Sequence, residues 1–390
     1  MPEHSVLKFE TRRHAPRTFS LHRAFLRISL VGVNAYAWVL LVLYFGGSLE
    51  IVAGLYFFSS ILTFFLTPLT ARLVSKGLIE CIMAATALYA LGCGALAICL
   101  SGDFGFGPLG AFLFIILSGL YRALYWVPYR AREEEKHILI GAPFAVDLIT
   151  ALTPLFLGYF IALHGGVWFL WFSGALATFS IFALAGATES YEKFSWDYKQ
   201  TFDALFATRH RRHLLAAILE GVQAAGLFFL WPLAIYLLVG GNFVVFGTVI
   251  SITLLLTMAL KLIMRYVREG HGIKLSPWMF SAVGASSWLM RLGVITPLQI
   301  ISVDVFQNMG HVGRNASMDV ITFEQAADNG HFLDEFSALK EMGLALGRIF
   351  MALIVVALAS FVSTTEALGY GIALAAALAA LLPYFSTQVR

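Results

Sequence analysis

The clearest candidate for chemistry in this sequence is an acidic residue inside an apolar segment. Asp304 lies seven residues after Pro297, which is a favourable first residue for a helix. A rise of 1.5 Å per residue would carry its carboxyl about 10 Å below the helix start, near the centre of a bilayer. Gln307, Asn308 and His311 follow at i+3, i+4 and i+7, so one helix face is polar. We expect this face to meet either water or a partner helix.

A carboxyl at this depth suggests proton transfer. An ionised side chain costs roughly 2.5–3.5 kcal/mol at the centre of a membrane helix, and protonation removes the charge. Burial raises the pKa of a carboxyl and a nearby arginine lowers it, so such a group can act as a switch. We interpret Asp304 as a proton carrier, with Asp147 or Glu220 as its relay or counter-ion. The alternative is a structural hydrogen bond, because polar side chains also hold membrane helices together.

The other charged candidates have simple alternatives as well. Asp147 is expected below the membrane midplane, where it could form an ion pair with Arg122. Glu220 and Arg122 lie close enough to the inner face for their charged ends to reach the headgroups. Tyr121, Tyr125 and Tyr129 recur at four-residue spacing, which is more typical of a packed helix face or an interfacial aromatic belt than of a platform for a ligand.

Helices that cross a membrane must carry these residues. The chain has 390 residues, of which 59% are hydrophobic and 13% charged, too apolar a balance for a soluble domain of this size. Its apolar runs have the length of about 20 residues that a helical span needs, and they lack the alternation of barrel strands. The sequence therefore predicts an all-α integral membrane protein and excludes an outer-membrane barrel.

Twelve such runs can be placed. They cover residues 24–46, 49–69, 78–100, 106–127, 139–163, 166–187, 214–239, 242–264, 275–294, 297–313, 341–362 and 366–386. Every second connection (47–50, 101–107, 163–167, 239–243, 294–298 and 363–367) has no Lys or Arg, whereas the other connections and the two ends of the chain hold 21 of the 26. The positive-inside rule then places both termini in the cytoplasm of a multi-pass protein of the inner or plasma membrane. Arg291, near the outer end of its span, is the exception.

The chain divides into two halves of six spans. We expect a basic cytoplasmic tail at 1–23, a six-helix bundle at 24–187, a charged cytoplasmic loop at 188–213 and a second bundle at 214–390. A repeat with an offset of 193 residues supports the division, although chance among many glycines is the alternative. The matching positions are Gly54 and Gly247, Arg72 and Arg265, and Gly77 and Gly270.

This organisation resembles the major facilitator superfamily over essentially the whole chain. The loop from Pro68 to Gly77 keeps the basic residues of the family's loop after its second span but lacks the acid. Pro154 and Gly158 match part of a motif in the fifth span of antiporters. The stretches 125–129 and 335–348 look like those of poorly characterised bacterial members.

The resemblance implies two pseudo-symmetric bundles, with spans one, four, seven and ten lining a central cavity. The candidates for the substrate cavity are then Asn34, Tyr121, Arg122, Tyr125, Gln223, Gln307 and Asn308. The candidates for a cytoplasmic gate are Arg72, Lys76, Arg265, Glu341 and Arg348. Of these, Glu341 and Arg348, together with Lys340, are expected to form ion pairs that latch the halves.

We therefore predict a secondary active transporter that moves a small organic solute by alternating access, coupled to protons, and that works as a monomer. The alternative is a non-transporting membrane protein of the same fold: a lipid scramblase, a receptor or an assembly factor. The sequence has no GxxxxGK[ST] or HExxH motif, and its three cysteines fall in one apolar span. We expect no enzymatic activity, cofactor, metal site or nucleic-acid partner.

Overall fold

The computed structural model describes residues 15–102, 107–134, 144–187, 189, 194–271, 277–310 and 333–381. Nearly all of these residues are helical, and none of them lies in a strand. Nine helices within this part are long and apolar enough to cross a membrane. Large apolar side chains such as Trp168, Phe156 and Phe182 are exposed on them. Because a bilayer solvates such surfaces and only helices or closed barrels satisfy their own backbone within it, the chain is a multi-pass membrane protein.

Six helices form the first half of the molecule. They are α1 (Ala15–Tyr44), α2 (Leu49–Ala71), α3 (Leu78–Ser101), α4 (Gly107–Glu134), α5 (Phe144–His164) and α6 (Gly166–Leu184). Helix α3 contacts α4 and α6, α1 contacts α5 and α6, and α2 contacts α4. Helix α1 begins at Ala15 and not at residue 24, since Phe19, His22 and Leu26 are buried. Part of the predicted basic tail is therefore helix.

The second half begins after the connector helix α7 (Tyr198–Phe206). Its helices are α8 (Arg211–Ala225), α9 (Trp231–Leu238), α10 (Phe243–His271), α11 (Pro277–Arg291), the helix at 297–310, α13 (Leu333–Ala359) and α14 (Thr364–Ala379). A π-helical segment, Gly226–Leu230, joins α8 to α9. Helix α13 starts at Leu333, so residues 333–340, predicted as a surface element, begin this helix. Because α11, 297–310 and α14 are shorter than the nine long spans, the count of twelve crossings stays a prediction.

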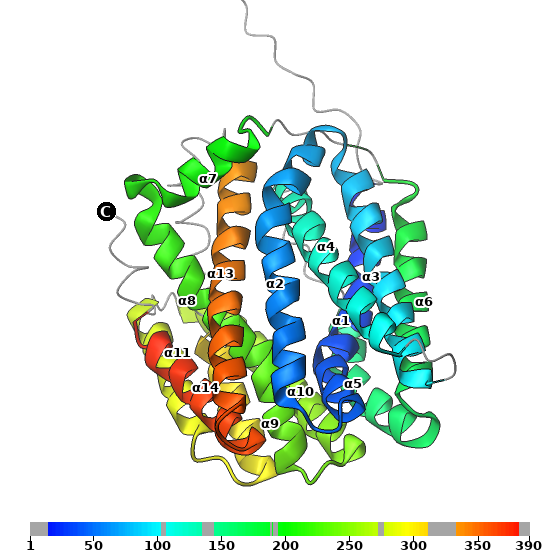
Figure 1. The fold of residues 1–390 in the computed structure, drawn as a ribbon, viewed down its shortest axis with the longest axis vertical. Helices are drawn as coiled ribbons and strands as arrows, with labels where there is room; N and C mark the ends of the chain where they lie inside the picture. The colour runs from blue at the N-terminus through cyan, green and yellow to red at the C-terminus, as the bar shows by residue number, and fades with distance from the viewer. Residues whose placement is uncertain are drawn as a thin grey trace, which may run out of the picture.

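The molecule has two distinguishable ends (Figure 1). At the connector end lie α7 and the 3₁₀ helix Arg72–Ser75. At the opposite turn end, tight turns join α1 to α2 and α9 to α10. Gly46 and Gly240 adopt positive φ values of 63° and 69° there, a conformation that only glycine takes up without strain. These turns are the predicted connections without basic residues.

Two helix pairs join the halves. Helix α2 packs against α13, side by side in Figure 1, and α5 packs against α10. A shift of 193 residues carries α2 onto α10 and α5 onto α13, so the two contacts are equivalent in the repeat. This arrangement is what a pseudo-two-fold relation between two six-helix bundles requires.

Helices α5 and α10 approach closely where Pro154 and Gly247 meet. The Tyr36 hydroxyl donates a hydrogen bond of 2.6 Å to the Pro154 carbonyl, and the Leu155 N–H donates one of 2.8 Å to Ser251 Oγ. A Cβ on Gly247 would overlap both the Pro154 carbonyl oxygen and the Tyr36 hydroxyl. The glycine is therefore needed for the halves to touch here.

Replacing Gly247 by alanine should lower the midpoint of thermal unfolding in detergent, because overpacking an interface costs about 1–3 kcal/mol. Gly54→Ala is the matched control at the equivalent position of the repeat, since nothing lies within 4 Å of a Cβ there. That variant should hold or raise the midpoint, because alanine favours a helix over glycine by about 1 kcal/mol. Equal midpoints for the two variants would contradict the close approach.

Candidate functional site

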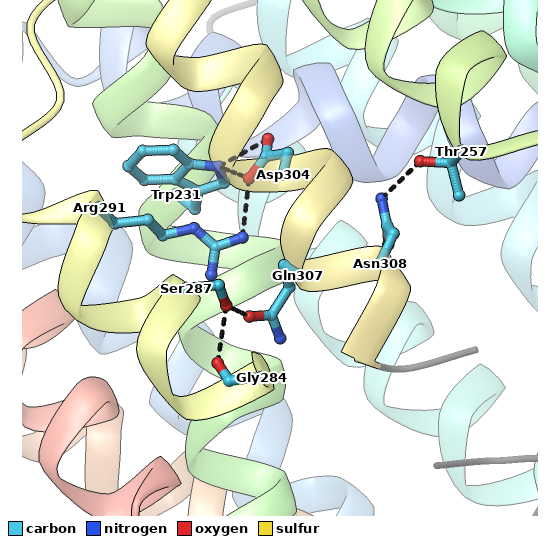
Figure 2. Close-up of polar contacts among 8 residues, drawn as sticks. All are labelled: Trp231, Thr257, Gly284, Ser287, Arg291, Asp304, Gln307 and Asn308. Carbon is cyan, nitrogen blue, oxygen red and sulfur yellow. Dashed lines mark hydrogen bonds and ion pairs between the residues drawn. The ribbon is translucent and has the colours of Figure 1, made fainter. Parts of the chain in front are cut away.

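Asp304 is the anion of an ion pair that lies within the second half (Figure 2). Arg291 Nη2 donates to Asp304 Oδ1 at 2.8 Å, and Trp231 Nε1 donates to Oδ1 at 2.8 Å and to Oδ2 at 3.0 Å. The arginine side chain is 1% exposed and that of Asp304 is 15% exposed. The partners of the Asp304 carboxyl are thus Arg291 and an indole donor, and neither of the acids predicted as its relay or counter-ion is among them.

Two indole rings hold the cation of this pair. The Arg291 guanidinium carbon lies 4.8 Å from the ring centroid of Trp231 and 4.4 Å from that of Trp288. An aromatic face attracts a cation most strongly where water is absent. Arg291 was missed as a functional residue, although its position as the one basic residue near the turn end was a usable signal.

The remaining polar residues of this face also bind neighbouring helices. The Ser287 hydroxyl of α11 donates to Gln307 Oε1, and Asn308 Nδ2 donates to Thr257 Oγ1 of α10 at 3.0 Å. Gln307 is 3% exposed. The stripe on the helix at 297–310 therefore meets partner helices, the second of the two expected environments. His311 lies outside the described residues.

The other two acids form separate ion pairs. Asp147 Oδ1 accepts a bond of 2.5 Å from Arg27 of α1 rather than from Arg122, and both side chains are more than a third exposed. Glu220 lies 3.8 Å from Lys340 Nζ, with the side chains 30% and 28% exposed. Exposed pairs of this kind contribute little to stability. Among the three predicted acids, Asp304 has the least exposed cationic partner.

Aromatic rings join the two halves in the part of the molecule nearer the turn end. The Phe229 ring stacks on Tyr56 of α2 with centroids 4.7 Å apart and meets Trp38 of α1 at 5.5 Å. We call Trp38, Tyr56 and Phe229 the aromatic contact. Phe229 belongs to the π-helical segment, two residues before Trp231. The aromatic contact is thus one short step along the chain from the Asp304 ion pair.

An ion pair joins the halves nearer the connector end. Arg130 Nη2 of α4 donates to Glu341 Oε1 of α13 at 2.5 Å, with side chains 20% and 2% exposed. Glu341 is one of the predicted gate residues, whereas Arg130 was not singled out. Of the other gate candidates, Arg72 and Lys76 are exposed at the connector end. The side chain of Arg265 lies outside the described residues.

Two arginines lie near each other on helices α4 and α13, which pack together across the halves. The Arg122 guanidinium lies 5.6 Å from the ring centroid of Tyr56 and within electrostatic range of Arg348 and Glu341. The Nη1 atoms of Arg122 and Arg348 are buried and have no hydrogen-bond partner in the described part of the chain. Among the described residues, Arg348 therefore has no part in the latching ion pair, which Arg130 forms with Glu341.

The uncharged cavity candidates fall in different environments. Tyr121 and Tyr125 are 6% and 3% exposed, and their rings contact each other in a tilted arrangement with centroids 5.1 Å apart in the core of the first half. Gln223 is 5% exposed, and its Nε2 has no partner among the described residues. Asn34 is exposed, although it shares a helix face with Trp38, which contacts the second half. Asn34 is therefore the exposed residue among the uncharged candidates.

Comparison with solved structures identifies this architecture. The chain is similar to a mutant form of the nucleoside transporter NupG, with a TM-score of 0.64 at 12% identity over 96% of this chain and 99% of that one. A bacterial homologue of the iron transporter ferroportin in an inward-facing state gives 0.67 at 12% identity, over 97% and 100%. A POT family transporter in complex with 5-aminolevulinic acid gives 0.65 at 12% identity, over 97% of each.

This likeness covers nearly the full length of each chain, so the predicted fold, that of major facilitator transporters, is confirmed. At such low identity it concerns the fold alone. The sequence itself matches no protein-family model and no curated protein. Substrate and mechanism must therefore be argued from the residues.

The Arg291–Asp304 pair predicts a strongly non-additive pair of substitutions. Asp304→Leu leaves the cation of Arg291 buried without its anion, and breaking a buried pair in this way costs about 3–5 kcal/mol. Arg291→Met in the same chain should restore most of the loss, because no buried charge then remains. Unfolding in mixed micelles of increasing dodecyl sulfate content measures both effects. Additive destabilisation by the two substitutions would show that the pair is not coupled.

Proposed function

We propose that the protein is a secondary active transporter that carries a small organic solute across a cell membrane by alternating access. One observation carries the proposal. Besides the packing of α2 on α13 and of α5 on α10, side chains join the halves at two separate depths: the aromatic contact nearer the turn end and the Arg130–Glu341 pair nearer the connector end. Alternating access requires two such contacts that open in turn. Both consist of side chains that can part without unfolding a helix.

Proton coupling is assigned to Asp304. When ionised, the carboxylate holds Arg291 and accepts both bonds from Trp231. Protonation removes the attraction for the guanidinium, which remains between the two indoles, and weakens the bonds from Trp231. Trp231 follows the π-helical segment that carries Phe229, and π segments are frequent at functional positions in helices. The protonation state of Asp304 would in this way bias the aromatic contact.

The remaining assignments follow from charge and fold. The connector end, with its basic residues, would face the cytoplasm of an inner or plasma membrane, together with both termini. Asp147 and Glu220 stay candidates for relaying protons between Asp304 and the two surfaces. The neighbours in structure are transporters, so an enzymatic role is not proposed. The working unit would be the monomer, since one chain contains both halves.

The alternative function is that of a lipid scramblase, receptor or assembly factor with the same fold. It would use the space between the halves for a lipid or a partner without coupling to a gradient. A scramblase equilibrates labelled lipid between leaflets in the absence of any ion gradient, whereas a proton-coupled transporter does not.

Substrate-dependent proton movement tests the transporter directly. A solute that raises the thermal midpoint in a screen is added to proteoliposomes that contain a pH-sensitive dye, and the internal pH should change. Asp304→Asn should abolish this change while the protein stays folded, because the amide oxygen still accepts bonds from Trp231 and Arg291 but does not titrate. Asp203→Asn, at an exposed acid of α7, is the control. Equal proton flux in the Asp304 variant would remove Asp304 from the mechanism.

Glu341→Gln should favour opening at the connector end, because Arg130 then loses its charged partner across the halves. Spin labels on Ser75→Cys and Arg211→Cys, both exposed and in different halves, report the separation once the three native cysteines are replaced by alanine. The distance distribution should shift toward longer values.

Glu80→Gln, at an exposed acid of the same end, should leave this distribution unchanged. A Glu341→Gln distribution identical to that of the parent chain would mean that the ion pair does not hold the halves together.

A further inference from the structure

The cluster of arginines between α4 and α13 has an excess of positive charge. Arg122, Arg130 and Arg348 lie on these two facing helices with Glu341, which Arg130 already binds. Arg122 lies within electrostatic range of Arg348, a group of like charge. Charged groups inside a membrane protein are costly unless they are paired. An excess of cations at this position therefore requires an anion from outside the chain or another reason to be kept.

Helix geometry places the two arginines at the same depth. Arg122 precedes Arg130 by eight residues on α4, and Arg348 follows Glu341 by seven residues on α13. The two helices run in opposite directions, so both arginines are displaced from the Arg130–Glu341 pair by about 10–12 Å toward the turn end. Glu341 and Arg348, at i and i+7, share one face of α13. The arginines thus face each other between the halves, beyond the ion pair that closes the connector end.

Some hydrogen-bond donors of this arginine cluster have no acceptor among the described residues. In the described part of the chain, Nη1 of Arg122 and Nη1 of Arg348 are buried and make no hydrogen bond. A buried donor without a partner costs free energy, and guanidinium groups bind carboxylate and phosphate oxygens through two parallel bonds. The ring of Tyr56 beside Arg122 adds an apolar wall.

We propose that Arg122 and Arg348 form a binding site for a soluble organic anion, one arginine from each half binding its carboxylate or phosphate oxygens. This inference rests on the transporter function and names its substrate class. An oxyanion bound by both arginines cancels their repulsion and draws α4 and α13 together. The site is connected to Asp304 only through intermediate residues: Tyr56 touches both Arg122 and Phe229. Phe229 lies two residues before Trp231, which donates to Asp304.

Three related probes test the site on the purified full-length protein in a neutral detergent. Benzoate and phenyl phosphate carry the oxyanions, and benzamide is the neutral analogue of benzoate. The anions should raise the thermal midpoint and bind in calorimetry, whereas benzamide should not. Arg122→Gln and Arg348→Gln should each weaken anion binding by roughly tenfold to a hundredfold. Arg209→Gln, at an exposed arginine outside the cluster, should leave it unchanged.

Two further measurements protect the test against misfolded variants. Arg122→Lys and Arg348→Lys keep the charge and lose the forked donor, so anion binding should fall less than with glutamine. In low salt without any probe, Arg348→Gln should raise the thermal midpoint, because it removes the repulsion from Arg122. A fall in that midpoint, equal binding of benzamide, or no binding of either anion would overturn the proposal.

The remaining outcomes separate this site from the transport function. Binding that depends on both arginines but is seen with phosphatidylglycerol alone would assign the site to a lipid headgroup and overturn the soluble anion. Asp304-dependent proton flux with a neutral solute, without anion binding, would retain the transporter and reject the site. Anion binding that depends on both arginines, without any flux, would retain the site and reject the transporter.

Discussion

The cost of an unpaired charge in an apolar medium governs this structure. Arg291 is almost fully buried, and it is tolerated because Asp304 neutralises it and two indole rings cover it. Glu341 is equally buried and is neutralised by Arg130 from the opposite half. The two ion pairs would respond differently to a movement of the halves. The first pair lies within one half and can persist while the halves move, whereas the second must break whenever α4 and α13 separate.

Aromatic packing connects these charges to one another. Tyr56 lies under the Arg122 guanidinium and stacks on Phe229, and Phe229 is two residues from Trp231, which donates to Asp304. A change in charge near Arg122 or at Asp304 would therefore alter the surroundings of the Tyr56 and Phe229 rings, which lie between them. The intervening π-helical segment has hydrogen bonds that differ from those of α8 and α9, so the helix can change its path there. This is the physical basis for coupling a proton to a solute in the proposed mechanism.

The pseudo-two-fold repeat gives equivalent positions different chemistry. The contacts of α2 with α13 and of α5 with α10 correspond to each other. In the contact of α5 with α10, Gly247 approaches Pro154 closely, and the Tyr36 hydroxyl donates a hydrogen bond to the Pro154 carbonyl. At the equivalent position in α2, a Cβ added to Gly54 would have no atom within 4 Å. The charged residues that join α4 to α13 are likewise specific to this pair of helices. The shift of 193 residues relates these two helices to the helix at 297–310 and to α5. Equivalent helices of the two halves thus make equivalent contacts, whereas the residues at those contacts differ.

The sequence by itself determined the membrane character, the helical class and the division into halves, because the length of apolar runs and the placement of basic residues depend on the bilayer and hardly on packing. It also drew attention to Asp304, since an acid in an apolar run stands out without any structure, whereas Glu341 was singled out through the resemblance to a family. Their partners Arg291 and Arg130, and the pairing of Asp147 with Arg27 in place of Arg122, depended on which helices lie side by side. Partners such as Glu341 and Arg130 are 211 residues apart, and no local pattern encodes such a distance. Only the tertiary structure could bring Arg122 and Arg348 near each other, because they lie on helices from opposite halves of the chain.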